Sequence, residues 1–245
     1  MATKIEWCDE TINAIKMRCT PVSEGCQNCY AERLLGRNLP GMDGYPPAGG
    51  APIMDYRDLE KPLHWKKPRR IFVESMGDLF HEDVEWNDQF KLFQFMTALP
   101  QHTFMILTKR PQVMAKRIKD IHFHLRRNIP VLQLPIPNIW LGVTIENNNH
   151  RDRWDELSQI PAAVRFVSVE PMLGRVDFGP RIDEIDWVIC GAETGPKARE
   201  MKTEWALDLL AQCDEAQVPF FFKKWSKGYM ELTEMPREYP RGTDG

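Results

Sequence analysis

The chain lacks the long apolar segments that membrane and secreted proteins need. Its longest apolar runs, such as IWLGV at 139–143, are far shorter than the roughly 20 residues of a membrane-spanning helix. The first sixteen residues also hold no apolar core of signal-peptide length. We therefore expect a cytoplasmic protein with no membrane partner.

The chain also lacks a basic excess and a dinucleotide-binding motif. Its 245 residues carry a net charge of −3, so the chain as a whole should not attract nucleic acid nonspecifically. A local basic stripe or an acid-lined pocket is still compatible with this balance. No G-x-G-x-x-G follows an expected strand, which argues against a doubly wound nucleotide-binding sheet.

Cysteine is scarce, and half of the six cysteines lie close together. Cys19, Cys26 and Cys29 fall in the stretch CTPVSEGCQNCYAER, where Gly25 permits unusual backbone angles before the close pair. In a reducing compartment, clustered cysteines bind metal or do redox chemistry more often than they form disulfides. The dispersed cysteines, at positions 8, 190 and 213, are expected to be small core residues.

The spacing C-x6-C-x2-C leaves three interpretations open. Three thiolates are one ligand short of a closed structural zinc site. The same three thiolates on a [4Fe–4S] cluster would leave one iron open for a substrate or cofactor. Plain buried thiols are the third interpretation. A zinc deaminase would need H-x-E and P-C-x-x-C, and neither is complete here.

Short apolar runs alternate with amphipathic stretches along most of the chain, which predicts repeated βα units. The expected strands lie at 12–17, 70–75, 104–109, 139–146, 165–170, 186–191 and 219–225. The expected helices lie at 30–37, 86–99, 110–120, 150–159 and 203–216. Since most of the strands are continuously apolar, they should be parallel and covered on both faces. The predicted fold class is α/β, a parallel, partial TIM-type barrel of about six to seven βα units.

Two segments depart from this rhythm. Residues 40–63 begin with a Pro/Gly-rich stretch and form an insertion that would act as a lid over the active face or be inert. Residues 226–245 lack a periodic core pattern. The predicted organisation is thus a barrel over 1–225 followed by a C-terminal extension over 226–245.

Polar residues follow the expected strands where a parallel barrel builds its working site. Four of these strand ends carry an acid, and four acids at one mouth would repel one another unless cations or ligand groups were shared among them. The acids at these ends are Glu74 with Asp78, Glu146, Glu170 and Glu193. The first strand leads into the cysteine loop, so the thiols should share the mouth with the acids.

The three-cysteine loop after the first strand of a partial barrel resembles the radical S-adenosylmethionine enzymes. More narrowly, the chain resembles a phage-associated radical-SAM-like family of unassigned function with a C-x6-C-x2-C motif followed by YAER. Further matches to that family are KIEW (4–7), KPRRIFV (67–73), SM and DLF (75–80), LTKR (107–110), WLGV (140–143), SVEP (168–171), GAE (191–193) and FFFK (220–223). The chain departs from the commoner C-x3-C-x2-C spacing, and it has Glu-Ser-Met where many relatives have two glycines and an acid.

This resemblance implies a [4Fe–4S] cluster and S-adenosylmethionine as cofactors. An electron from an external flavodoxin- or ferredoxin-like donor would cleave the cofactor to a 5′-deoxyadenosyl radical that abstracts hydrogen from a substrate. The implied cluster ligands are Cys19, Cys26 and Cys29. The implied cofactor-binding residues are Tyr30, Glu74, Ser75, Met76, Asp78, Thr144, Glu146 and Asn147. The implied catalytic residues are Glu170, Glu193, Lys109 and Lys224.

The substrate expected from the resemblance is a small molecule or a nucleic-acid base. Phage enzymes of this type suggest rearrangement or modification of a nucleotide or DNA base, such as an amino-acid-decorated thymidine in DNA hypermodification, and the protein would then work in the host cytoplasm. Two alternatives stay open: a zinc-dependent hydrolase or deaminase, and a non-catalytic, metal-stabilised binding module. Arg69, Arg70, Lys109, Arg110, Lys223 and Lys224 are candidates to face phosphates or bases, although the run 66–70 also fits a plain charged approach to a strand.

Overall fold

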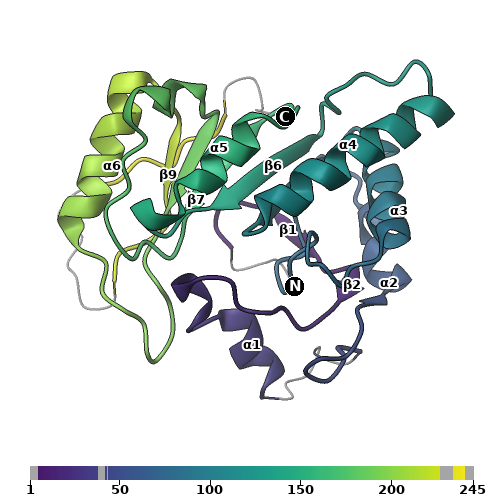
Figure 1. Ribbon diagram of the computed structural model, residues 1–245, viewed down its shortest axis with the longest axis horizontal. Helices are drawn as coiled ribbons and strands as arrows, with labels where there is room; N and C mark the ends of the chain where they lie inside the picture. The colour runs from purple at the N-terminus through teal and green to yellow at the C-terminus, as the bar shows by residue number, and fades with distance from the viewer. Residues whose placement is uncertain (1–4, 38–41, 43, 227–233, 241–245) are drawn as a thin grey trace.

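The fold is built on one curled sheet of seven parallel strands (Figure 1). The computed structural model describes residues 5–37, 42, 44–226 and 234–240. The strands are β1 (Glu10–Ile12), β4 (Arg70–Val73), β5 (Thr103–Thr108), β6 (Ile139–Thr144), β7 (Arg165–Val169), β8 (Trp187–Cys190) and β9 (Phe220–Phe222). They lie side by side in chain order, with β1 and β9 at the edges, so the barrel is open. The predicted α/β class and partial parallel barrel are confirmed.

Helices follow most of the strands and bury their apolar sides against the sheet. They are α1 (Tyr30–Leu35), α3 (Trp86–Thr97), α4 (Pro111–Asn128), α5 (Asp152–Ser158) and α6 (Thr203–Ala216). The prediction ended α4 at 120, but the buried positions continue at spacings of three and four through Ile121 and Leu125, which extends the helix. The crossover between β7 and β8 is a short 3-10 turn, η4 (Gly179–Glu184). Among the described residues, no helix has both the length and the apolar character to cross a membrane.

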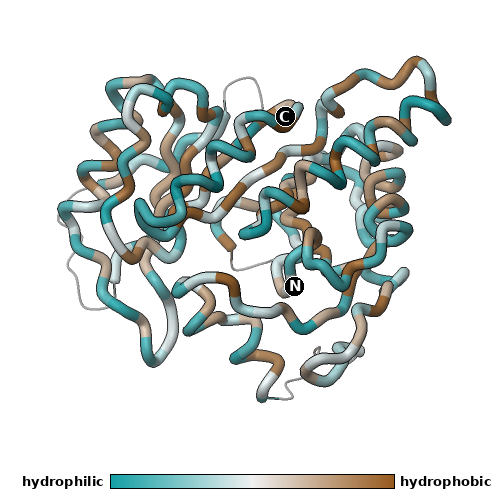
Figure 2. Tube along the Cα trace, in the orientation of Figure 1, coloured by the Kyte–Doolittle hydropathy of each residue, from teal (hydrophilic) through white to brown (hydrophobic). Residues whose placement is uncertain are grey.

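The strands are apolar on both faces, which explains their continuous hydrophobic runs (Figure 2). On β4, Ile71 and Val73 belong to the main core under the helices, whereas Phe72 points to the opposite face. There it meets an aromatic cluster that includes Trp7 and Trp187, whose ring centroids lie 6.2 Å apart. The segment before β1 therefore fills part of the inside of the curl.

The first expected strand, 12–17, is wrong in its bounds. The sheet strand β1 comes earlier and ends at Ile12, and the chain then leaves the sheet because the Asn13 amide donates to the Asp58 carboxylate at 2.7 Å. Residues Ile15–Lys16 form β2, which pairs antiparallel with β3 (Ile53–Met54) in a separate two-stranded sheet. Two short polar-flanked pieces were thus merged into one expected strand.

Much of the expected insertion is packed against the body of the fold. After β3 come α2 (Tyr56–Leu59) and the 3-10 turn η2 (Lys61–His64), and Leu59 lies in the main core. The buried Asp58 pairs with Lys16 at 3.2 Å. A lid within 40–63 would therefore have to be limited to its first part, and residues 40, 41 and 43 lie outside the described residues.

The expected C-terminal extension contributes to the fold where the structure describes it. The amide of Phe222 donates to the carbonyl of Pro236 at 2.8 Å, and the amide of Glu238 donates to the carbonyl of Phe220 at 3.0 Å. Residues 234–240 therefore cover the free edge of β9. The remainder of that extension, 227–233 and 241–245, lies outside the described residues.

Candidate functional site

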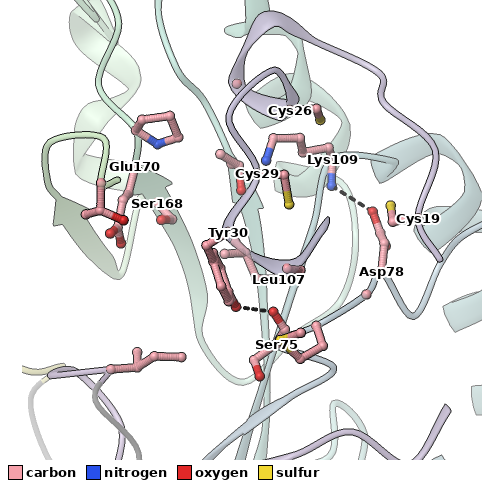
Figure 3. A pocket seen from close by; sticks show the side chains of 18 of the residues that line it. Cys19, Cys26, Cys29, Tyr30, Ser75, Asp78, Leu107, Lys109, Ser168 and Glu170 are labelled. Atoms are coloured by element: carbon pink, nitrogen blue, oxygen red, sulfur yellow. Dashed lines mark hydrogen bonds between the residues drawn. The ribbon is translucent and has the colours of Figure 1, made fainter. Parts of the chain in front are cut away.

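A cavity of about 530 Å³ opens at the carboxyl ends of the parallel strands. It brings together residues from the cysteine loop and from the ends of β4 to β9 (Figure 3). Thirteen of the fifteen predicted site residues line it: Cys19, Cys26, Cys29, Tyr30, Glu74, Ser75, Met76, Asp78, Lys109, Thr144, Glu170, Glu193 and Lys224. Glu146 and Asn147 do not, and they lie behind the cysteine loop.

The three clustered cysteines are free thiols on one loop, and the dispersed cysteines at 8, 190 and 213 are buried as expected. Cys26 ends a short 3-10 turn, η1 (Glu24–Cys26), and Cys29 caps the start of α1. Burial raises the pKa of the Cys19 thiol to about 11, nearby Asp78 adds to the rise, and Arg110 opposes it. A metal that binds this thiol would have to displace its proton.

Glu146 supports the cysteine loop through buried contacts. Its side chain is fully buried, accepts a hydrogen bond from Ser23 at 2.5 Å and pairs with Arg153 at 2.8 Å. A Cβ atom built on Gly25 would lie 2.7 Å from Cγ and 2.8 Å from Cδ of Glu146, and closer still to Oε1. Gly25 is therefore required by this close approach, and its φ is not positive, contrary to the expectation of unusual backbone angles.

Three hydrogen bonds to Glu24 fasten the outer side of the loop. Glu24 accepts hydrogen bonds from Asn147 at 2.5 Å and from His150 at 2.7 Å, and these bonds lower its pKa to about 2. Arg199 donates to the carbonyl of Glu24 at 2.9 Å. The loop is thus tied to the segments after β6 and β8. The prediction that Glu146 and Asn147 bind the cofactor stays a prediction, because both side chains are occupied by the loop in this structure.

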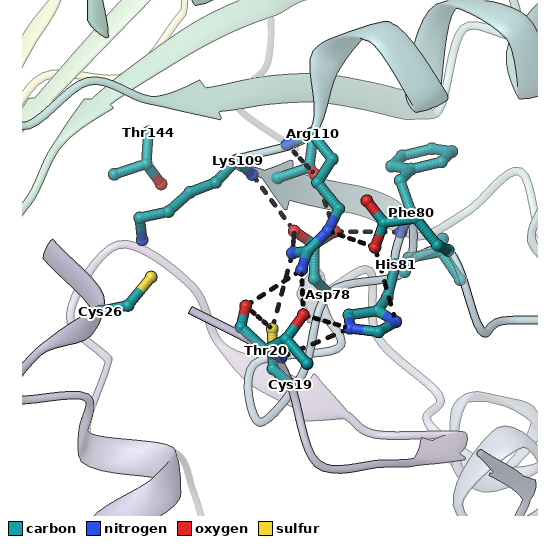
Figure 4. Close-up of polar contacts among 12 residues, drawn as sticks. Cys19, Thr20, Cys26, Asp78, Phe80, His81, Lys109, Arg110 and Thr144 are labelled. Atoms are coloured by element: carbon teal, nitrogen blue, oxygen red, sulfur yellow. Dashed lines mark hydrogen bonds and ion pairs between the residues drawn. The ribbon is translucent and has the colours of Figure 1, made fainter. Parts of the chain in front are cut away.

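Arg110 fastens the start of the loop through a buried network (Figure 4). Its guanidinium lies 3.1 Å from Asp78 and 3.7 Å from the Cys19 sulfur, and it donates to the Thr20 carbonyl at 3.0 Å. Asp78 also accepts from the Thr108 hydroxyl at 2.7 Å. The guanidinium of Arg110 is therefore occupied by contacts within the protein, which corrects the interpretation that it faces phosphates or bases.

Arg69 and Arg70 lie at the amino end of β4 or just before it, at the opposite end of the strand from the cavity. Arg70 stacks on the Tyr239 ring, with its guanidinium carbon 3.7 Å from the ring centroid. The interpretation of 66–70 as a charged approach to a strand therefore fits Arg69 and Arg70 better than contact with a ligand in the cavity.

Glu74, directly after β4, combines a strained backbone conformation with a buried carboxyl group. Glu74 has a φ of 59°, is 3% exposed, and accepts from the Ile15 amide at 2.9 Å. Its second oxygen has no hydrogen-bond partner among the described residues. Burial raises the pKa of Glu74 to about 8, so the group is mostly protonated at neutral pH. A left-handed backbone at a non-glycine residue is uncommon and clusters at functional sites.

The residues after Glu74 are held by Asn13, which directly follows β1, and by Tyr30 of α1. Asn13 accepts hydrogen bonds from the Ser75 hydroxyl at 3.3 Å and from the Met76 amide at 2.8 Å. The Tyr30 hydroxyl donates to the Ser75 carbonyl. The predicted segment Glu74 to Met76 is thus fixed at the cavity wall next to the start of the helix that follows Cys29.

The remaining acids at the mouth also have cations of their own. Glu170 pairs with Lys223 at 2.5 Å. Burial disfavours the charge of Glu193, but hydrogen bonds from Arg199 and Asn28 outweigh burial and lower its pKa. Each charged strand-end acid therefore has a cationic partner within the protein. The positive charge that the sequence led us to expect near these acids comes from Lys and Arg side chains.

Two lysines add positive charge to the cavity wall. Lys109 lies 3.7 Å from Glu146 and extends toward Cys26 (Figure 4). The exposed ammonium group of Lys224 has no ion pair within the described part of the chain. The floor of the cavity is apolar and includes Trp7 and Phe72. The cavity thus offers thiols, cations and aromatic surface to one ligand.

A model of a family described as protein of unknown function (DUF5131) matches residues 2–241. The chain belongs to the DUF5131 family. No curated protein and no solved structure matches it. The match includes every residue of the cavity, so the cysteine loop and the strand ends of this DUF5131 chain lie within one family unit.

Sequence reasoning missed most of the residues that support the cysteine loop of this DUF5131 protein. Arg153 and Arg199 lie in a helix and a loop that carry no recognisable motif, and their partners are distant in the chain or buried. Asn13 is a single polar residue within the expected strand 12–17, and Ser23 is a single polar residue of the cysteine loop. A buried carboxylate at a strand end demands a cation, and that rule could have prompted a search for arginines, although not their positions.

Proposed function

We propose that the chain is a radical S-adenosylmethionine enzyme that modifies or rearranges a nucleotide or a nucleic-acid base. The observation that supports this most is the placement of three free thiols on one loop at the carboxyl mouth of a parallel half-barrel. They face the same cavity as the strand-end side chains. The carboxyl mouth is where parallel barrels bind substrates.

The donor set fits a [4Fe–4S] cluster held by Cys19, Cys26 and Cys29. A single zinc ion draws its thiolates to about 2.3 Å from one point. Three thiolates are one ligand short of the closed tetrahedral site of a structural zinc. A four-iron cluster binds each thiolate through a different iron, so it accepts more widely spaced sulfurs. Three thiolates also leave one iron for the cofactor.

When bound, the cluster and S-adenosylmethionine supply one-electron chemistry that removes a hydrogen atom from a substrate. The residues of the chain bind, orient and exclude water. Glu146 and Arg199 fix the loop, so that the three sulfurs keep their places as ligands arrive. Trp7 and Phe72 form a dry floor on which a planar ring can stack.

The polar wall divides into two groups of residues. Tyr30, Glu74, Ser75, Met76 and Thr144 reach the cavity and are the residues proposed to contact the cofactor. Asp78, Glu146 and Asn147 are proposed to act as positioning residues, because they hold Arg110 and the cysteine loop. The protonated Glu74 can donate a hydrogen bond at neutral pH, which an ionised carboxylate cannot do.

The proposed catalytic residues are charged groups of the cavity wall. Lys224 has a free ammonium group among the described residues, so we propose that it meets an anionic group of the substrate. Lys109 is loosely paired and could serve the same role. Glu170 and Glu193 are already paired and would orient the substrate through Lys223 and Arg199. The one electron comes from an external flavodoxin- or ferredoxin-like donor.

Anaerobic reconstitution followed by a product assay tests the proposal. The protein should bind about four irons and four sulfides per chain and should form 5′-deoxyadenosine from S-adenosylmethionine only with a reductant. Cys26→Ala should lose both properties. Cys213→Ala is the matched control, because Cys213 is buried on α6 away from the cavity and should keep them. A colourless protein with one zinc per chain, or a Cys26→Ala variant that still cleaves the cofactor, would refute the proposal.

A further inference from the structure

The outer side of α4 carries an unusual concentration of unpaired positive charge. We define the α4 basic face as Lys116, Lys119, Phe123, Arg126 and Arg127, which are all exposed. Their spacing of three and four residues places them on one side of the helix. The opposite side of α4, with Met114, Ile118, Ile121 and Leu125, is buried in the main core. The face therefore points away from the protein.

The charge of α4 differs in sign from that of the whole protein. The helix holds five Lys or Arg and one Asp, a net charge of +4, whereas the chain as a whole has −3. Some exposed cations on other elements have acidic partners, such as Arg181 with Asp155 at 2.6 Å and Arg175 with Asp208 at 3.0 Å. In the part of the chain that the structure describes, none of the four cations of the α4 basic face has an ion pair or hydrogen bond.

An exposed aromatic ring lies among these cations. Phe123 is 64% exposed, and its ring centroid is 5.4 Å from that of His124, which meets it edge to face. His124 in turn packs against Trp86 at 5.1 Å. The Phe123 ring is therefore supported from one side. Arg126 and Arg127 line an open hollow together with Phe123.

We infer that the α4 basic face binds single-stranded nucleic acid. From Lys116 to Arg127 the face is about 16 Å long at 1.5 Å per residue, which is enough to contact several consecutive phosphates. Cations that follow a backbone, interrupted by an aromatic ring on which a base stacks, are the features of single-strand binding surfaces. A lipid surface would require a broad apolar side, and Phe123 is the one apolar residue of this face.

The position of α4 links this face to the cavity. The helix begins at Pro111, directly after Arg110 and the cavity residue Lys109, and runs away from the mouth (Figure 1). This inference deepens the proposed function, on which its purpose rests, because a strand held along α4 would belong to the polymer whose base enters the cavity. The binding itself requires no cluster, so it can be tested separately.

Fluorescence anisotropy of a labelled 12-nucleotide DNA strand with the full chain, without reconstitution, tests the inference. Arg126→Gln/Arg127→Gln should weaken binding about tenfold and lower the slope of log K against log salt by roughly 1.4, as expected for two lost phosphate contacts on a single strand. Phe123→Ala should weaken the single strand about tenfold, leave the salt slope unchanged and affect a duplex less. Lys66→Gln/Lys67→Gln is the charge-matched control, since both lysines are exposed and lie outside α4.

The outcomes separate this inference from its competitors. Absence of binding at low salt would overturn it, whatever the cluster assays show. An equal loss of affinity in both double variants would show that binding depends only on nonspecific charge, and this result would also overturn the inference. Polyglutamate binding as tight as the oligonucleotide, or Phe123-dependent binding to anionic phosphatidylserine vesicles without oligonucleotide binding, would assign the face to an acidic protein or to a membrane. Unchanged thermal unfolding of all the variants would show that the losses are not caused by misfolding.

Discussion

The close approach of Gly25 to Glu146 gives the sharpest test of how the cysteine loop is held. In Gly25→Ala the added methyl would meet Cγ and Cδ of Glu146 at 2.7 and 2.8 Å, whereas ordinary contacts begin at 3.4 Å. Glu146 cannot swing aside, because it is fully buried and pairs with Arg153. The loop must therefore move away from Glu146. Overpacking of this kind costs about 1–3 kcal/mol.

Thermal unfolding of the unreconstituted protein measures this cost without any metal. For a chain of this size we expect Gly25→Ala to lower the Tm by roughly 2–12 °C. Glu146→Asp retracts the carboxylate by one methylene and keeps its charge, so the double variant Gly25→Ala/Glu146→Asp should lose less stability than the sum of the two single variants. Additive losses, or a Gly25→Ala protein as stable as wild type, would refute the reasoning. If the proposed function is right, Gly25→Ala should also retain less iron after reconstitution than the double variant.

Three further predictions concern the other groups of the cavity. The pKa of Glu74 is raised to about 8 in the folded state, above its ordinary value of 4.5, so its contribution favours the fold below pH 4.5 and is lost as pH rises toward 8. Between pH 5 and 8 the wild type should therefore lose unfolding free energy on the order of 3–5 kcal/mol through Glu74, and Glu74→Gln should not show this part of the loss. Urea denaturation across this pH range measures the difference, and identical pH profiles for the two proteins would contradict the prediction. Arg110→Ala leaves the buried Asp78 without its cation and should cost about 3–5 kcal/mol in the same assay, while the companion Arg110→Ala/Asp78→Asn should recover part of that loss. Lys224→Ala should raise the KM for substrate with little change in stability or iron content, and an unchanged KM would remove Lys224 from the substrate site.

The coarse architecture could be predicted from the sequence because strands buried on both faces leave continuous apolar runs. The runs around Phe104, Val143 and Val188 were placed within one or two residues for this reason. The first strand was misplaced because Glu10 and Thr11 are polar and only Ile12 is apolar, while Ile15 and Lys16 pair elsewhere. A two-residue antiparallel pairing between positions 15–16 and 53–54 leaves no local pattern to detect.

The convergence of the site could be predicted, but the roles of its members could not. Parallel topology places Asp78, Glu170 and Glu193 at one mouth together with the thiols, as expected. Whether an acid faces the cavity or supports the loop depends on partners distant in sequence, such as Ser23 with Glu146 across 123 positions. The buried state of Glu74 likewise depends on packing against β2 and its neighbours, which composition and periodicity do not encode.

The central claim is a cluster held by three cysteines with one iron left for a cofactor. Electron paramagnetic resonance of the reduced, anaerobically reconstituted protein, recorded before and after S-adenosylmethionine is added, tests that claim most directly. We predict a [4Fe–4S]⁺ signal whose g-values change when the cofactor is added, with Cys213→Ala behaving like wild type. A protein with no such signal, or a cluster whose spectrum is identical with and without the cofactor, would contradict the account.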